Sequence, residues 1–231
     1  MGGARKHGSL LLGSQLRGKL VLMSPQIPEG MREDAASTWP PRELIDSFLG
    51  GHDFEFRLGE HTPIPDTEEA AAQARNFRDV LGQFCTGVTV VTSMSDGEPV
   101  GMTCQSFTSV SLDPPLVMFC PAKTSRAFPL MRRAGYFCVN LLAADQVDIS
   151  NGMATKGANK YDGVSYQTAV TGAPVLDGVL GYIDCSIEAV HEGGDHYLVV
   201  GRVRELAVGD KSGNQPDEPL LFYRGKYTRT E

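Results

Sequence analysis

The sequence predicts a mainly β fold of the α+β class, a β-barrel that carries peripheral helices. Short runs rich in Val, Ile, Thr and aromatic residues recur between turn signals, which is typical of antiparallel sheets. The chain contains neither a G-x-G-x-x-G sequence nor a P-loop, and its strands do not alternate with helices as in doubly wound sheets. A Rossmann dehydrogenase is therefore disfavoured.

Composition and charge narrow the class of protein further. The chain has 231 residues, of which 41% are apolar and 21% charged, as in an ordinary globular protein. A net charge of −7 argues against nucleic acid as the main partner. No apolar run approaches the roughly 18 residues that would span a membrane. Five cysteines without a C-x-x-C pair, and histidines without metal-ligand spacing, indicate free thiols in a reducing cytoplasm and no metal site.

The chain divides into two parts by composition. Residues 1–65 are basic at the start and then rich in Pro and acidic residues, and Arg17 and Lys19 interrupt what would be the apolar core of a signal peptide. We expect this part to be a loosely structured extension or one that wraps onto a partner subunit. Residues 66–231 are expected to form the folded domain.

The folded part is predicted to open with a helix and a hairpin. Asp66 and Glu69 form a capping-box-like pattern, and an apolar face follows at helical spacing. That face consists of Phe77, Val80, Leu81 and Phe84. Strands are expected over 88–94 and 99–103, joined at Asp96-Gly97, where positive φ is tolerated.

Residues 101–115 are the most informative stretch, because they lie between two strand-like runs and are rich in small polar residues. A long connection of this kind suits a polyoxygenated ligand such as a phosphate or a flavin, and the alternative is a solvated loop. After it we expect a strand over 116–120 and a short helix capped by Thr124 or Ser125 that ends at Gly135.

The remaining elements follow from alternation and turn residues. A strand is predicted over 136–142, a helix over 143–153 and irregular structure over 154–180. The clearest alternation of apolar and polar residues lies at 182–189. A tight turn at Gly193-Gly194-Asp195-His196 leads into a strand over 197–208, and the last strand is expected over 220–227.

Five segments, in order, resemble the short-chain flavin reductase family, whose fold is the FMN-binding split barrel. They are residues 77–88, 103–115, 136–142, 194–196 and 219–227. The resemblance covers about residues 74–231. Residues 104–107, 119–121 and 222–225 resemble most closely the reductase components of two-component flavin-dependent monooxygenases, in particular those of steroid (secosteroid) degradation. The long N-terminal extension departs from the usual short members.

The resemblance implies an NAD(P)H-dependent flavin reductase. NADH or NADPH would reduce FMN or FAD, and the reduced flavin would diffuse to a separate oxygenase of steroid or aromatic degradation. It also implies a homodimer, because related barrels build the flavin cleft at a subunit interface. A non-catalytic flavin-binding protein on the same barrel is the alternative. A pyridoxine-phosphate-oxidase-like enzyme is disfavoured, since only Lys123 and Arg126 stand together as basic residues in the loop region.

The same resemblance assigns the cofactor-binding residues. On the ring side these are Met102, Thr103, Cys104, Gln105 and Ser106. On the phosphate side they are Cys120, Pro121, Ala122, Ser125 and Arg126, with Asn140, Tyr223 and Arg224 as further contacts. The residues alone leave other roles open: Cys104 as a small buried filler, Ser125 as a plain helix cap beside a solvent-facing Arg126, and Asn140 as a side chain that pins a strand end.

His196 is expected to be the catalytic residue, beside the nicotinamide, where it would bond a carboxamide or flavin carbonyl or relay a proton. A structural histidine in a turn is the alternative. Lys160 and Tyr161 resemble a Lys-aromatic pair near the cofactor. Hydride transfer needs little acid–base machinery, so no catalytic triad is expected.

Overall fold

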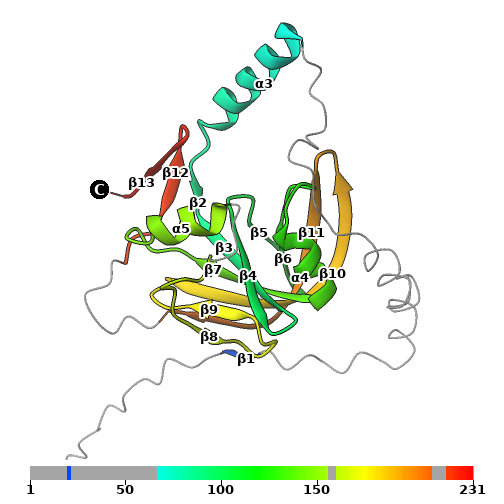
Figure 1. Ribbon diagram of the computed structural model, residues 1–231, viewed down its shortest axis with the longest axis vertical. Coiled ribbons are helices and arrows are strands. Elements are labelled where there is room, and N and C mark those ends of the chain that lie inside the picture. The colour runs from blue at the N-terminus through cyan, green and yellow to red at the C-terminus, as the bar shows by residue number, and fades with distance from the viewer. Residues whose placement is uncertain (1–19, 22–66, 156–159, 210–216, 231) are drawn as a thin grey trace, which may run out of the picture.

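The computed structural model describes residues 20–21, 67–155, 160–209 and 217–230 (Figure 1). Its centre is an eight-stranded antiparallel sheet with the order β4-β3-β7-β10-β11-β6-β5, and β1 pairs with β11. The strands are β1 (Leu20–Val21), β3 (Thr89–Ser95), β4 (Glu98–Cys104), β5 (Thr108–Leu112), β6 (Pro115–Phe119), β7 (Tyr136–Leu141), β10 (Gly181–Gly193) and β11 (His196–Val208). The predicted mainly β fold is confirmed.

In the described part of the chain, two small sheets and three helices surround the large sheet. One small sheet has the order β13-β12-β2 and the other pairs β8 with β9. The remaining strands and helices are β2 (Thr86–Gly87), β8 (Tyr166–Thr168), β9 (Pro174–Leu176), β12 (Leu221–Tyr223), β13 (Lys226–Thr228), α3 (Glu68–Leu81), α4 (Ala127–Ala134) and α5 (Val147–Ala154). Helices α4 and α5 lie on the body, whereas α3 stands away from it (Figure 1).

The main core is aromatic and lies between the sheet and α4. The rings of Phe119 and Phe137 meet edge to face with centroids 4.8 Å apart, and Phe128 of α4 lies 6.2 Å from Phe119. All three side chains, together with Met131 of α4, are fully buried. Gly135 ends α4 with φ of +81°, the left-handed conformation that the predicted helix stop requires.

Three short strands were missed by the sequence prediction. Residues 108–112, expected to belong to a long connection, form β5, so only 105–107 join β4 to β5. Residues 154–180, expected to be irregular, contain the β8–β9 pair. Side chains of the large sheet hold β9 in place, because Thr92 Oγ1 and Asn140 Nδ2 both donate to the carbonyl of Pro174, at 2.5 and 3.3 Å.

Two further boundaries were wrong. The helix expected over 143–153 begins only at Val147, after a turn in which Gln146 Oε1 accepts from Ala143 N at 3.0 Å. The single closing strand expected over 220–227 is a hairpin, because Arg224 and Gly225 adopt φ of +48° and +76° between β12 and β13.

Helix α3 forms as predicted but finds no partner for its apolar face. Thr67 is its N-cap and accepts from Ala70 N at 3.2 Å, whereas the cap predicted at Asp66 falls outside the described residues. Within the described chain, every large apolar side chain of that face stays exposed: Phe77 at 65%, Val80 at 59%, Leu81 at 55% and Phe84, just beyond the helix, at 75%. The division expected at residue 65 and the form of residues 1–65 also lie outside the described part, apart from β1.

Candidate functional site

Ser106 joins the two connections that the sequence assigned to the cofactor. Its hydroxyl donates to the carbonyl of Cys120 and accepts from the amide of Cys120, both at 3.0 Å. The Sγ of Cys104 lies 3.2 Å from the same hydroxyl oxygen. The end of β4 and the end of β6, sixteen residues apart in the chain between Cys104 and Cys120, are thus fixed to one another by one short side chain.

Cys104 is buried while Cys120 is partly exposed. Burial raises the pKa of the Cys104 thiol, with hydrogen bonds from Ser106 and Cys120 opposing the shift. A thiol of this kind stays neutral at physiological pH and is a poor nucleophile. The geometry therefore fits Cys104 as an unreactive side chain that lines the candidate site, which is compatible with its alternative role as a small buried filler.

The start of α4 lies next to β4, the strand that carries Cys104. Ser125 Oγ is 3.5 Å from Met102 Sδ and accepts from the amide of Phe128 at 3.2 Å, so from just outside α4 it satisfies a first-turn amide, as its alternative role requires. Arg126 is the N-cap residue, is exposed, and makes no side-chain cap bond among the described residues. The first turn of α4 has no acidic residue. Helix dipole, serine hydroxyl and guanidinium are together suited to an anion such as a phosphate.

The tip of the β10–β11 hairpin is fastened to the segment that precedes α4. His196 forms an isolated bridge with Ala122, the amide of Lys123 donates to the carbonyl of Asp195 at 2.9 Å, and Tyr197 N donates to the carbonyl of Pro121 at 2.9 Å. The backbone thereby brings the predicted nicotinamide side and the predicted phosphate side together. The ring of His196 is half-exposed, and its Nδ1 lies 2.8 Å from Asp195 Oδ1.

Some predicted residues have other tasks in this chain. Thr103 Oγ1 donates to the carbonyl of Ser150 in α5 at 2.5 Å, and Gln105 is exposed. Asn140 is fully buried, and its amide bonds to Val90 O, Thr92 Oγ1, Pro174 O and Leu176 N. Both the Nδ2 and the Oδ1 of Asn140 are bonded within the protein, which favours its alternative role as a side chain that pins strands.

Tyr223 and Arg224 lie apart from the cluster of Cys104, Ser106, Ser125 and His196. They form the turn between β12 and β13, which Figure 1 shows on the side of the molecule opposite to α4. Arg224 donates to Gln83 Oε1 through Nε and Nη2 at 2.9 and 2.6 Å and lies over the Tyr223 ring at 5.1 Å. Within one described chain these residues hold the end of α3.

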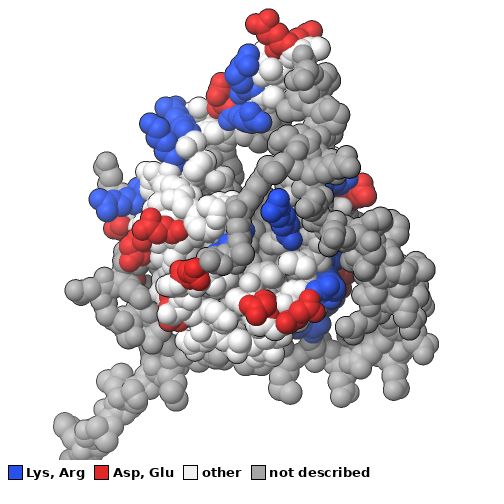
Figure 2. Space-filling model, viewed as in Figure 1, with Lys and Arg blue, Asp and Glu red and all other residues white. Residues whose placement is uncertain are grey.

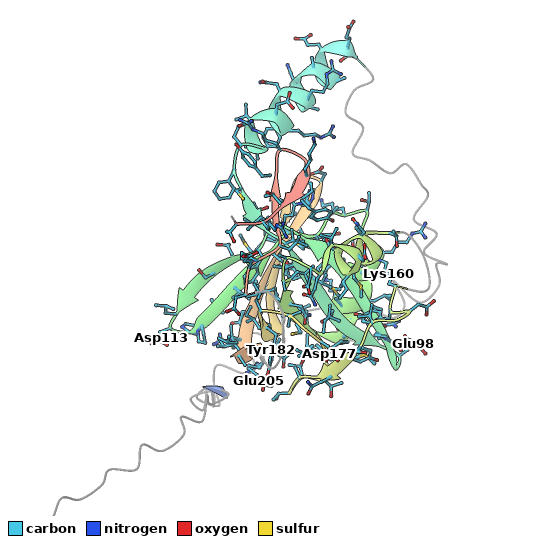
Figure 3. All side chains as sticks on the ribbon, turned by 90° about the vertical axis from the view of Figure 1, so that its left-hand side faces the viewer. Glu98, Asp113, Lys160, Asp177, Tyr182 and Glu205 are labelled. Carbon is cyan, nitrogen blue, oxygen red and sulfur yellow. The ribbon has the colours of Figure 1, made fainter. Side chains whose placement is uncertain are left out.

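Lys160 and Tyr161 fasten β4 just before the predicted ring-binding residues. Lys160 Nζ donates to the carbonyls of Gly101 and Met153 at 3.2 and 2.8 Å, and Tyr161 Oη donates to Val100 O at 3.0 Å. Burial lowers the pKa of Lys160. Figure 3 places Lys160 on the side of the molecule opposite to Asp113 at the tip of the β5–β6 hairpin.

Three charged residues near the β10–β11 tip had no role predicted from the sequence. Asp195 contacts the ring of His196, and Lys123 Nζ pairs with Glu192 Oε2 at 2.9 Å and lies 5.5 Å from the centre of the Tyr197 ring. The signal for Asp195 was its place beside His196 in the turn. The Lys123–Glu192 pair could not be read from the sequence, because it joins residues far apart in the chain.

Charges of both signs are interspersed over the face shown in Figure 2, and acidic side chains stand at the outer end of α3. No helix among the described residues is long and apolar enough to cross a membrane. All five cysteines are free, and three of them, Cys104, Cys138 and Cys185, are buried.

Comparison with known proteins gives consistent relatives. Residues 81–231 match the flavin reductase like domain family. The reductase subunit HsaB of a flavin-dependent monooxygenase from Rhodococcus jostii is 49% identical over 161 residues, covering 70% of this chain and 80% of the relative. A flavin reductase from Pseudomonas putida is 48% identical over 152 residues, covering 65% of this chain and 86% of the relative.

Solved structures agree with these relatives. A homologue of nitrilotriacetate monooxygenase component B from Mycobacterium thermoresistibile superposes with a TM-score of 0.66 at 46% identity, over 70% of this chain and 88% of that chain. The NADH:FAD oxidoreductase SgcE6 of Streptomyces globisporus, in complex with NAD and FAD fragments, has a TM-score of 0.63 at 34% identity, over 69% and 94%. The split β-barrel predicted from the sequence is confirmed.

Proposed function

The chain belongs to the flavin reductase family and is an NAD(P)H:flavin oxidoreductase, and from that premise we propose that the cluster of Cys104, Ser106, Ser125 and His196 is its active site. The observation that carries the proposal is the junction of β4, β6, α4 and the β10–β11 tip, fixed by the bonds of Ser106 to Cys120 and of Lys123 to Asp195. Four separate segments meet there, and each carries residues that the sequence assigned to cofactor binding.

The residues at this junction fit a flavin and a nicotinamide. The start of α4, with Ser125 and Arg126, would hold the flavin phosphate, because an anion is favoured there. Met102, Cys104, Gln105 and Ser106 would lie along the ring system, and His196 would bind the nicotinamide. The bound flavin supplies hydride acceptance, and the protein's part is to orient the two rings and exclude water.

A homodimer belongs to this proposal. The exposed apolar face of α3 is a surface that a second copy would cover, since monomers seldom leave four large apolar side chains together in water. Tyr223 and Arg224 lie beside the end of that face. In a dimer they would be available to the partner's cleft, which would reconcile their predicted role with their position.

The oxygenase partner is the finer part of the proposal. Relatives are named as reductase subunits or components of flavin-dependent monooxygenases, which supports delivery of reduced flavin to a separate oxygenase. From the sequence resemblance we expect the substrate of that oxygenase to be a steroid or an aromatic compound. We place the protein in the cytoplasm, because its buried cysteines are free thiols.

Stopped-flow NADH oxidation with FMN and FAD in turn, at matched concentrations, tests the function. A reductase oxidises NADH only when flavin is present and needs no oxygenase, and the ratio of the two rates gives the flavin preference. The same series with NADPH gives the nicotinamide preference. Tight flavin binding with negligible NADH turnover would instead identify a non-catalytic flavin-binding protein.

A further inference from the structure

The β10–β11 hairpin ends in a two-residue turn that places Asp195 beside His196. Gly193 and His196 are the last cross-strand pair, and Gly194, the first turn residue, has φ of +70°. A positive φ at this position is typical of the tight hairpin turns that favour glycine. Neighbouring side chains on a strand point to opposite faces, so Asp195 reaches the ring of His196 because it lies in the turn and not in the strand.

The contact between the two side chains determines where the ring carries its proton. Asp195 Oδ1 and His196 Nδ1 are 2.8 Å apart. This hydrogen bond lowers the pKa of the Asp195 carboxyl. An ionised carboxylate only accepts hydrogen bonds, so Nδ1 must be the protonated nitrogen. In the neutral ring the lone pair is then on Nε2, which bonds to no group in the described part of the chain.

We propose that Asp195 is a positioning residue for His196, which it holds in the Nδ1–H tautomer so that Nε2 accepts a hydrogen bond from the carboxamide N–H of the nicotinamide. The inference rests on the proposed function, because it takes the nicotinamide to bind beside His196. No bond is made or broken by this pair; its task is to present an acceptor in a fixed direction. Without Asp195 the ring would be free to carry its proton on Nε2. The Nε2–H group and the carboxamide N–H would then both be donors, and no hydrogen bond would form between them.

The backbone around the pair is stiff enough for this task. The carbonyl of Asp195 accepts from Lys123 N at 2.9 Å and His196 bridges to Ala122. Both members of the pair are therefore fixed on the segment that leads to Ser125 and α4.

The test combines a spectroscopic and a kinetic measurement on the full chain. ¹⁵N NMR of histidine-labelled protein without cofactor should show His196 as the Nδ1–H tautomer, with assignment by loss of the signal in His196→Ala. In Asp195→Ala the Nε2–H form should gain population. KM for NADH should rise by up to about tenfold, the upper range for one hydrogen bond between neutral groups, with a smaller change in KM for flavin. Asp195→Glu keeps a carboxylate acceptor and should restore part of the loss, whereas Asp195→Asn, whose amide can also donate to Nδ1, should not.

Matched controls separate positioning from folding. Glu192→Gln removes a neighbouring carboxylate that does not touch His196 and should leave the tautomer unchanged. Adding Asp195→Ala to His196→Ala should cause no further loss, because the two residues would act as a unit. An unchanged tautomer in Asp195→Ala, or an additive loss in the double variant, overturns the inference. Wild-type protein that fails to oxidise NADH would refute the proposed function, whereas the NMR result decides the role of Asp195 on its own.

Discussion

The Ser106 hydroxyl is a single group on which two backbone segments depend. It donates to and accepts from the backbone of Cys120 while it contacts Cys104. Its replacement would leave the amide and carbonyl of Cys120 without these partners. Ser106, which the sequence predicted only as one donor among several, therefore also joins the end of β4 to the end of β6.

We expect Ser106→Ala to raise KM for flavin by about five- to tenfold, since a net hydrogen bond contributes about 1 kcal/mol. Steady-state kinetics with varied flavin at saturating NADH measure the change. Ser109→Ala is the matched control, because Ser109 is exposed on the edge strand β5. Equal KM values in the two variants would show that Ser106 does not shape the flavin site.

Asp184 is a fully buried carboxyl with a predictable effect on stability. The carboxylate oxygens of Asp184 accept from Thr171 N and Oγ1 at 2.9 and 2.6 Å. Asp184 is the cross-strand neighbour of Glu205, which accepts from Tyr182 Oη at 2.9 Å. Figure 3 shows Tyr182 and Glu205 close to one another. Burial raises its pKa, and the charge of Glu205 acts in the same direction.

A raised pKa in the folded state means that Asp184 stays protonated to a higher pH in the folded protein than in the unfolded chain. The contribution of Asp184 is therefore fully present below the ordinary carboxyl pKa, about 4, and is lost as pH rises through the higher folded value. Urea unfolding of the wild type and of Asp184→Asn from pH 4 to 8 checks this. The free energy of unfolding of the wild type should decline relative to the variant as pH rises, and parallel curves would contradict the assignment.

Among the strands and helices, those with strong internal patterns were predicted well. The alternation at 182–189 gave part of β10, and Gly135 marked the end of α4. The missed strands β5, β8 and β9 have three to five residues each, too few for a clear alternation of apolar and polar residues. Thr92 and Asn140, from distant strands, bind the carbonyl of Pro174 in β9. No local pattern in the sequence contains that contact.

Gly201 of β11 packs against core side chains, and its replacement tests how tightly that core is packed. A Cβ at Gly201 would lie 2.3 Å from Phe137 Cζ and 3.1 Å from Cys185 Cβ. Gly201→Ala should therefore destabilise the protein by about 1–3 kcal/mol, as overpacking of a core does. The matched change Gly152→Ala, in α5 where nothing lies within 4 Å of the added Cβ, should instead stabilise by about 0.5–1 kcal/mol. Thermal unfolding of both variants measures the contrast, and equal melting temperatures would refute it.

For the molecule as a whole, the sequence predicted which residues of the candidate site cluster better than it predicted whether one chain completes that site. Residues 120–126 and the turn at His196 lie together because β6 and β11 are neighbours in the sheet. β4 stands at the other end of the strand order, and the bonds of Ser106 to Cys120 join its end to the end of β6. Tyr223 and Arg224 do not join them within one chain, and the apolar face of α3 has no described partner. Sequence patterns indicate that a face is apolar, but they do not say which molecule covers it.

The exposed apolar face of α3 gives the prediction that tests the proposed homodimer. Phe77→Ser with Leu81→Ser removes two of its largest side chains, exposed at 65% and 55% in the chain alone. If a second copy covers them, the double variant should dissociate at concentrations where the wild type is a dimer, because each buried side chain of this size contributes about 1.5–3 kcal/mol. Light scattering after size exclusion measures the mass. Arg75→Ser with Asp79→Ser, exposed polar residues on the opposite face of the same helix, should leave the dimer intact. A wild-type monomer, or a double apolar variant that stays dimeric, would show that α3 is not the contact, whereas dissociation with loss of NADH oxidation would indicate that the cleft needs both copies.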